Sequence, residues 1–414
     1  CSIALTLFVT VALAQHLMPE SFGRFNYLLA LVSLVAPLMA MGLNSIISRE
    51  VINRPKDSGL ILGTALGLRC AVSSVVVPLF IGIAYIYLDY ADWLLFSVLM
   101  LSSIFDAALI FDFWLQAHGA NRHASLLRFA SLAFFSMVRI AAIKLGAGLP
   151  VFVYLAGLEL ITIGLLYLLV YSRLLRGKPN LRATWQESKI LLMDSRWLML
   201  SGVAAMIYLK VDQVMLGVMI NDRAVGIYAA AARISEVWYF FPAAIVTAFF
   251  PQLIKKRLQD PDSYQLDLQK INDGLFLSAL SVALLVTLMA GWALPVIFGP
   301  AYADAAPVLV VQVWVGVFVF MRALLSKWFI VENFLKLSML SQVLGAVVNI
   351  ILNIYLIPLY GPVGAAYATV ISFGVAGYIV LFLHRDLWPM ARVVTKSILL
   401  PYRMLKDGRN LYKV

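Results

Sequence analysis

The stretch 206–251, MIYLKVDQVMLGVMINDRAVGIYAAAARISEVWYFFPAAIVTAFFP, predicts two apolar helices joined by a short polar turn at 221–224. Both helices contain charged residues within an apolar segment that is long enough to cross a membrane. These are Lys210 and Asp212 in the first helix, and Arg233 and Glu236 in the second. An isolated ion at such a depth costs at least ~3 kcal/mol, so opposite charges on neighbouring helices are expected to pair. The stretch therefore predicts a polar contact inside a bundle of membrane helices.

The distance of each charge from the turn predicts how the charges pair. Asp212 and Arg233 lie about equally far from the turn, at a rise of ~1.5 Å per residue, and the other two charges lie one helical turn deeper. We therefore expect two ion pairs, Asp212–Arg233 and Lys210–Glu236. The same counting predicts two further pairs in the first part of the chain, Arg69–Asp112 and Arg139–Glu159.

The composition indicates a membrane protein along the whole chain. Of its residues 63% are hydrophobic and 13% are charged, and the mean hydropathy is +0.92. A soluble domain cannot bury so much apolar surface, so we predict an all-α polytopic membrane protein. Two cysteines do not make a disulfide framework, and no spacing of Cys and His suggests a metal site. The apolar run that opens the chain is interpreted as part of a first membrane helix and not as a signal peptide, because it has no basic leader.

Twelve apolar segments follow one another in two groups of six. The first group lies at about 1–17, 25–48, 60–88, 93–117, 124–146 and 149–172, and the second at about 197–220, 226–254, 271–294, 303–325, 334–357 and 363–384. We therefore predict an N-terminal six-helix lobe at 1–172, a basic linker at 173–196, a second six-helix lobe at 197–384 and a basic tail at 385–414. The tail is expected to form an amphipathic helix that lies on the membrane surface as far as Pro401.

The two lobes resemble each other weakly at the entry to their second spans. PESFGRFNY precedes one span and DRAVGIYAA precedes the other, and a proline follows each in mid-helix, at Pro37 and Pro242. Two six-span lobes begin on the same side of the membrane, so a pseudo-symmetry axis along the membrane normal would relate them. Substrate is then expected in a central cavity between the lobes.

The basic residues predict the orientation. Most of the 32 Lys and Arg residues lie in alternate loops, in the linker and in the tail, whereas the opposite loops contain few. The positive-inside rule makes the crowded side cytoplasmic and places both termini there. The net charge of +11 is therefore a signal of topology, and we expect no nucleic acid as a partner.

Four stretches resemble the signature of one family. VDQVMLGVMINDRAVGIYAAAARISEVWYFFPAAIVTAFFP resembles the region around helices seven and eight of the Wzx-type flippases, which belong to the multidrug/oligosaccharidyl-lipid/polysaccharide exporter superfamily. PESFGRF is similar to the first turn of that family, and IFGPAYADAAPVL is similar to its entry to helix ten. NIILNIYLIPLYGPVGAAYAT is similar to its helices eleven and twelve. The resemblance extends over nearly the whole chain.

The resemblance implies a function as well as a fold. Members of the family have two six-helix lobes around a central cavity, and they move undecaprenyl-pyrophosphate-linked oligosaccharide from the cytoplasmic to the periplasmic leaflet by alternating access. It further implies a multi-pass protein of the bacterial inner membrane that meets membrane lipids and works beside the polymerase and chain-length proteins of the pathway. No cofactor is expected.

Arginine is the natural partner of a pyrophosphate, because its planar guanidinium group offers a fork of donors. Candidates for substrate binding inside the spans are Arg69, Arg139, Lys210 and Arg233. A second set near the cytoplasmic ends of spans comprises Arg49, Arg128, Arg322 and Lys327. Amide candidates for sugar hydroxyls include Asn349 and Asn353, which share one helix face. Each set has an alternative interpretation. The cations inside the spans could form ion pairs that hold helices together, the second set could only extend to the membrane interface, and the amides could join helices.

Two other functions compete with glycan export. A multidrug exporter driven by sodium or protons would use buried acids as coupling sites, and the candidates are Asp106, Glu159, Asp212 and Glu236. A membrane polymerase or ligase of lipid-linked sugars would need a large outer loop to hold its acceptor, and the predicted outer loops are all short. The chain also lacks a recognisable catalytic motif, so we expect a transporter and not an enzyme.

Overall fold

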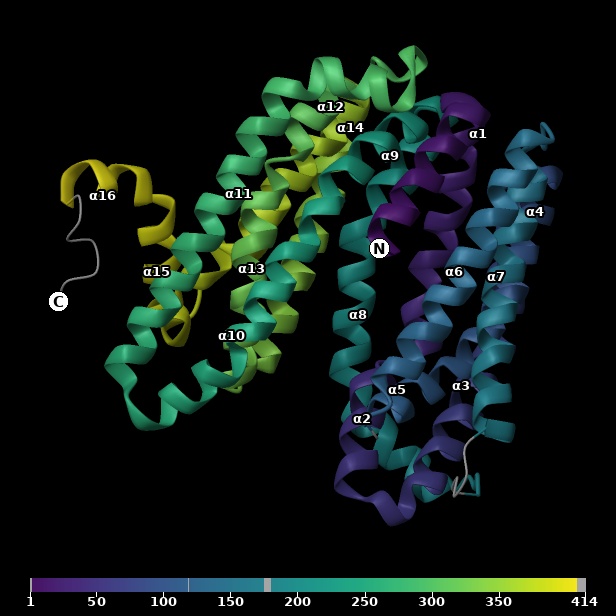
Figure 1. The fold of residues 1–414 in the computed structure, drawn as a ribbon, viewed down its shortest axis with the longest axis horizontal. Coiled ribbons are helices and arrows are strands. Elements are labelled where there is room, and N and C mark those ends of the chain that lie inside the picture. Colours follow the sequence, from purple (N-terminus) through teal and green to yellow (C-terminus); the bar gives the residue numbers. More distant parts are fainter. Residues whose placement is uncertain (1, 118, 175–179, 408–414) are drawn as a thin grey trace. The chain divides into compact units, whose positions relative to one another are not determined.

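The computed structural model describes residues 2–117, 119–174 and 180–407, and these residues form helices and turns without a strand. The chain divides into two compact units, Cys1–Gly217 and Val218–Val414. Figure 1 shows that the long helices of each unit pack side by side. This arrangement confirms the predicted all-α membrane fold.

The helices of the first unit are α1 (Ser2–Ala40), α2 (Leu43–Asn53), η1 (Pro55–Asp57), α3 (Ser58–Tyr87), α4 (Tyr90–Ser102), η2 (Ser103–Leu109), α5 (Ile110–Ala117), α6 (Asn121–Lys144), α7 (Leu149–Leu169), the π-helical turn η3 (Val170–Leu174) and α8 (Trp185–Met219). Those of the second unit are α9 (Asp222–Glu236), η4 (Val237–Tyr239), α10 (Phe240–Gln259), α11 (Pro261–Phe298), η5 (Pro300–Tyr302), α12 (Ala305–Gln312), α13 (Val315–Val331), α14 (Leu335–Gly377), η6 (Ile379–Phe382), η7 (Arg385–Leu387), α15 (Trp388–Ile398) and α16 (Leu400–Asp407).

Among the described residues, nine helical stretches are long and apolar enough to cross a membrane. Two of them each contain two predicted spans, because the backbone leaves the helical conformation within α1 at Met18 (φ 61°) and within α14 at Gly361 (φ 57°). A proline follows each of these residues and removes a further helical hydrogen bond. The remaining predicted span, 226–254, lies in α9 and α10, which η4 interrupts. All twelve predicted spans are thus helical.

Helix α8 packs onto the first unit, although the sequence places most of it in the second lobe. Leu191 of α8 is fully buried in the same apolar core as Leu43 and Ile61. A Cβ atom at Gly42 would lie 2.5 Å from the backbone nitrogen of Met199, so glycine permits a close backbone approach. The compact units therefore divide at Gly217 and not in the basic linker at 173–196, of which 175–179 lie outside the described residues. The predicted lobe boundaries, which rest on counting spans, stay a prediction.

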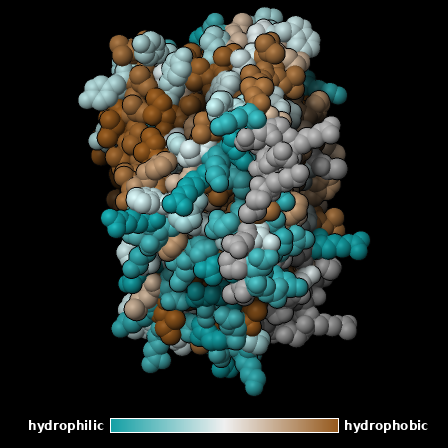
Figure 2. All heavy atoms as spheres, turned by 90° about the vertical axis from the view of Figure 1, so that its left-hand side faces the viewer, coloured by the Kyte–Doolittle hydropathy of each residue, from teal (hydrophilic) through white to brown (hydrophobic). Residues whose placement is uncertain are grey.

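The tail forms helices, and the apolar face of α15 packs on the second unit. Val393 and Val394 of α15 are buried, and α15 packs against α11. Asp273 of α11 accepts a 2.6 Å hydrogen bond from Ser397 and lies 3.4 Å from the guanidinium group of Arg403. These contacts hold α15 and the start of α16 on the second unit, and the predicted position of the tail on the membrane surface stays a prediction. Figure 2 shows the side on which α15 and α16 lie, with hydrophobic residues gathered above and hydrophilic residues below.

Candidate functional site

A polar cavity of about 310 Å³ lies inside the first unit, among segments that the sequence predicts to span the membrane. Its lining comes from α1, α2, α3, η2, α5 and α6, and the polar residues among it are Asn44, Arg69, Ser73, Asp106, Asp112 and Arg128. We call it the Arg69 cavity. Its volume is at the lower end of the range of about 300–1,000 Å³ that is usual for small-molecule sites. It therefore has room for a charged headgroup and not for a chain of sugars.

A break between α1 and α2 positions one wall of the cavity. Met41 (φ 54°) and Gly42 (φ 64°) both adopt left-handed backbone conformations, which end α1 at Ala40. Because α1 ends at Ala40, the carbonyl oxygen of this residue can accept from a side chain, and Arg69 lies 3.4 Å from it. The same break begins α2 at Leu43 and brings Asn44 to the cavity.

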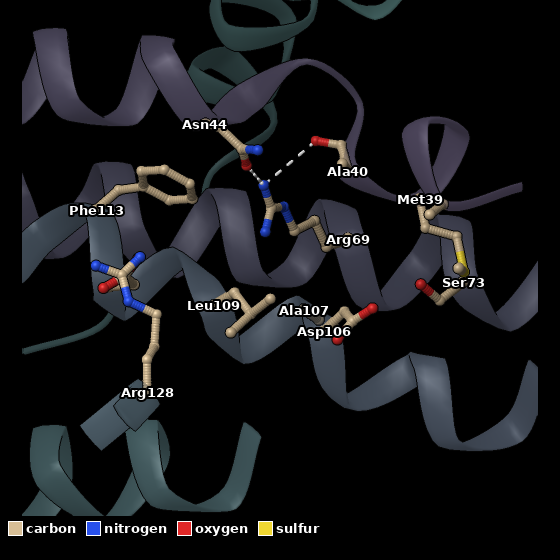
Figure 3. Close-up of a pocket in the computed structure, with 12 residues that line it drawn as sticks. Met39, Ala40, Asn44, Arg69, Ser73, Asp106, Ala107, Leu109, Phe113 and Arg128 are labelled. Atoms are coloured by element: carbon tan, nitrogen blue, oxygen red, sulfur yellow. Dashed lines mark hydrogen bonds and ion pairs between the residues drawn. The ribbon is translucent and has the colours of Figure 1, made fainter. Parts of the chain in front are cut away.

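Arg69 lies at the centre of this wall and is 3% exposed. Its Nη2 atom donates to the side-chain oxygen of Asn44 and, at 3.4 Å, to the carbonyl oxygen of Ala40 (Figure 3). Its Nε atom is buried without a hydrogen-bond partner among the described residues. No carboxylate among the described residues forms an ion pair with Arg69. A buried guanidinium group is thus held by neutral oxygen atoms only.

The predicted pair Arg69–Asp112 is wrong, because Asp112 is bound by other donors. It accepts hydrogen bonds from Tyr167 at 2.8 Å, from Gln116 at 2.9 Å and from Arg128 at 3.1 Å. Depth counting assumed a continuous α-helix from the turn near Tyr90, whereas the seven residues of η2 form a 3₁₀-helix. At ~0.5 Å more rise and ~20° more rotation per residue, this segment moves Asp112 ~3.5 Å deeper and turns it by ~140°.

The 3₁₀ segment also places Asp106 in the cavity. Runs of this length are uncommon and often mark functional hinges. The segment lies close to α7, since a Cβ atom at Gly164 would meet the Phe105 carbonyl oxygen at 2.5 Å. Asp106 accepts no hydrogen bond from any of the described residues, and it shares the cavity with Arg69.

The charges of the cavity balance, but they are not equally engaged. Two guanidinium groups and two carboxylates line it. Asp112 is saturated by three donors and neutralises Arg128, whose side chain is half exposed. Arg69 keeps a free donor, and Asp106 keeps free acceptors. The arrangement is suited to bind an anion at Arg69 and a proton or cation at Asp106.

The other predicted site residues of the first unit lie outside this lining. The predicted pair Arg139–Glu159 is confirmed, with 2.5 Å between the guanidinium nitrogen and the carboxylate oxygen, and it joins α6 to α7. Arg49 binds Glu50 at 2.8 Å and Asp194 at 2.5 Å, which ties α2 to α8.

Two predicted pairs join residues of different units. Lys210 and Asp212 lie on α8 within the first unit, and Asp212 is buried there. Arg233 and Glu236 lie on α9 of the second unit, where their charged groups are 3.9 Å apart on one helix. The pairs Asp212–Arg233 and Lys210–Glu236 therefore stay predictions.

The predicted site residues of the second unit engage neighbours within that unit. Arg322 donates to the carbonyl oxygen of Ala376 at 2.7 Å and to the hydroxyl oxygen of Ser341 at 3.1 Å, and the Lys327 ammonium lies 5.0 Å from the ring centre of Phe250. Asn349 and Asn353 are fully buried. They join the two limbs of α14 in what we call the α14 cluster, which comprises Tyr228, Asn349, Asn353, Thr369 and Ser372. Here the amides connect helices, as the alternative interpretation expected.

Sequence reasoning missed the partners that organise the Arg69 cavity. Tyr167 stands in an apolar span with no feature that links it to Asp112. Arg128 was grouped with residues at the ends of spans, although it faces the cavity. An acid and a base that lie sixteen residues apart across one turn, such as Asp112 and Arg128, were the available signal.

The fold is similar to that of a class of solved membrane proteins, the transporters with two helical lobes. A solved structure of the lipid II flippase MurJ in an inward closed conformation is 14% identical, with a TM-score of 0.70 over 98% of this chain and 91% of that one. An inward-facing multidrug resistance MATE transporter of the MOP superfamily is 16% identical, with a TM-score of 0.72 over 99% of this chain and 96% of that one. Both likenesses concern the fold.

The chain belongs to the family of polysaccharide biosynthesis proteins, whose model matches residues 2–256. Among curated relatives, the probable flippase AglR of Haloferax volcanii is 26% identical over 377 residues, which are 88% of this chain and 76% of that protein. The probable low-salt glycan biosynthesis flippase Agl15 of the same organism is 22% identical over 202 residues, which are 47% of this chain and 41% of that protein. The resemblance to polysaccharide exporters is thus confirmed.

Proposed function

We propose that this chain is a flippase that moves an undecaprenyl-pyrophosphate-linked oligosaccharide, such as an O-antigen, capsule or exopolysaccharide repeat unit, from the cytoplasmic to the periplasmic leaflet. Three findings support this proposal: the family, the two curated relatives named as probable flippases, and a fold shared with a lipid II flippase. Alternating access between the two lobes would expose the substrate to each side in turn.

The main observation behind the proposal is that the guanidinium group of Arg69 is buried without a carboxylate partner among the described residues. A guanidinium group buried in a membrane span without a carboxylate partner is costly, and such residues usually mark a substrate or ion pathway. Arg69 meets this description, because the described residues give it two neutral oxygen acceptors and leave its Nε donor free. A pyrophosphate would supply the missing negative charge and accept from the free donor.

Arg128 would assist from the facing helix α6. Its side chain is half exposed, and its ion pair with Asp112 holds it at the cavity. The sugars would remain in a wetter space outside this cavity, and the polyprenyl chain would stay in lipid. Arg139 and Arg233 each lie near a carboxylate, so they would bind the substrate only when that contact opens.

We further propose that the protein lies in the bacterial inner membrane with both termini cytoplasmic, and that it works beside the polymerase and chain-length proteins of its pathway. The excess of Lys and Arg in alternate loops, the linker and the tail supports this orientation. A cysteine placed at Lys189, within the basic linker, tests this orientation by chemical labelling in a variant without the natural cysteines. If a membrane-impermeant reagent labels this cysteine from outside intact cells, the proposed orientation is wrong.

Replacement of Arg69 tests the transport function. Arg69→Ala should abolish surface glycan in cells that lack their own flippase, while the protein level stays near that of the wild type. Arg69→Lys should restore only part of the display, since a point charge lacks the planar fork. Arg223→Ala is the matched control, because Arg223 is exposed and pairs with an exposed Asp304. Normal glycan display by Arg69→Ala would exclude Arg69 from substrate binding.

A cation-coupled multidrug exporter is the second candidate, and the free carboxylate of Asp106 favours it. In that case the protein should confer resistance to a cationic drug such as ethidium, and Asp106→Asn should remove the resistance. Glycan display without any change in drug resistance would favour the flippase.

A further inference from the structure

A groove of about 420 Å³ follows the outer side of α15, opposite the face that packs on α11. Its lining is Phe382, Trp388, Ala391, Arg392, Thr395 and Lys396. We propose that this groove binds one anionic phospholipid, with the headgroup phosphate between the two basic side chains and an acyl chain along the aromatic ones. The proposal goes beyond the flippase function and does not depend on which glycan the protein carries.

The charges of the groove are uncompensated. Arg392 and Lys396 stand four residues apart on one face of α15, and both are exposed. No carboxylate of the described residues pairs with either of them, and the nearby Asp386 lies 3.5 Å from the imidazole of His384. Two unpaired cations beside each other repel, so an anion that lies between them is stabilised.

The aromatic residues of the lining form an apolar surface that is exposed to solvent. The rings of Trp388 and Phe382 are about half exposed, and Leu399 at the end of α15 is likewise half exposed. An indole ring prefers the membrane interface, where its apolar body and its N–H group are both accommodated. Cationic heads next to such rings match a lipid, in which a phosphate adjoins hydrocarbon.

The groove is preformed and lies where a span meets the membrane surface. Helix α14, which contains the last span, ends at Gly377, and η6 follows directly with Phe382 as its last residue. Thr395 in the floor lies 3.0 Å from the hydroxyl of Tyr378, and Ser397 on the opposite face is bound to Asp273. Binding therefore needs no ordering of α15, which lowers its entropic cost.

Native mass spectrometry of the purified full chain tests the proposal with two probes, dioleoyl phosphatidylglycerol and dioleoyl phosphatidylcholine. We expect one phosphatidylglycerol to bind more tightly than phosphatidylcholine. Each basic residue near a membrane surface is worth about fivefold in affinity for anionic lipid, so Arg392→Gln with Lys396→Gln should weaken that binding about thirty-fold. Phosphatidylglycerol should also raise the thermal midpoint of the wild type and leave that of the double variant unchanged.

The matched control is Lys255→Gln with Lys336→Gln, which removes two exposed charges elsewhere in the same unit. It should keep the affinity of the wild type, and Arg392→Lys with Lys396 intact should keep most of it. Equal binding of both lipids, or an equal loss in the control variant, would overturn the proposal. Undecaprenyl pyrophosphate that displaces phosphatidylglycerol at equal concentration would also overturn it, because the groove would then be a substrate site.

Discussion

The Arg69 cavity and the α14 cluster both place polar groups among apolar helices, but they differ in whether these groups border an open space. In the α14 cluster, Asn353 donates to Asn349 at 3.1 Å and Tyr228 lies 3.2 Å from Thr369, and each residue is buried. In the Arg69 cavity, a donor of Arg69 and the carboxylate of Asp106 remain free beside an open space. Polar residues of membrane spans thus either connect helices or face a space that a ligand can enter, and the difference between these two regions lies in that open space.

The largest effect is expected from Asp112, the saturated carboxylate of the cavity. Asp112→Ala removes the carboxylate that binds Arg128 and leaves the hydroxyl of Tyr167 with only a 3.4 Å contact to the carbonyl oxygen of Ala124. Loss of the hydrogen bonds that this buried carboxylate accepts, from Tyr167 above all, should lower the free energy of unfolding by about 3 kcal/mol, as measured by chemical unfolding in detergent. Asp112→Ala with Arg128→Ala should recover part of this loss. A double variant as unstable as the single one would show that the ion pair contributes nothing.

A smaller effect separates the two polar regions. Asn349→Ala opens the α14 cluster and leaves buried partners unsatisfied, so it should lower the free energy of unfolding by about 2 kcal/mol. Glycan display per folded molecule should not change. Asn44→Ala should also lower stability, but in contrast to Asn349→Ala it should weaken transport per folded molecule as well, because Asn44 orients Arg69. Equal transport losses in both variants would erase the distinction between the two regions.

The smallest effect concerns the contact of α7 with the 3₁₀ segment. A methyl group at Gly164 would lie 2.5 Å from the Phe105 carbonyl oxygen, so the backbone must shift, and such overpacking should cost about 1–3 kcal/mol. Gly82→Ala on α3 is the control, since its methyl group would meet no neighbour and should stabilise the helix slightly. If Gly164→Ala reduces transport more than stability, the position of Asp106 matters to function. Equal and small effects in both variants would show that the segment adapts freely.

The sequence predicted the helices well because apolar length and charge are local properties. It also predicted the pair Arg139–Glu159, since two uninterrupted helices joined by a short turn obey simple depth counting. The same method failed for Arg69 and Asp112, where η2 changes both rise and rotation. No residue pattern in this apolar span predicts a 3₁₀ segment. Its close contact with α7 depends on tertiary packing at Gly164.

The anchoring of α8 has a consequence for the degrees of freedom between the two units. Most of α8 belongs to the first unit. The basic linker at 173–196 therefore connects two elements of that unit and does not join the two units. The covalent connection between the units is instead the two residues between Met219 and Asp222. Two intervening residues make three Cα–Cα steps, so the last residue of α8 and the first residue of α9 lie at most about 11 Å apart. A longer tether at this point would relax this limit while leaving each unit folded.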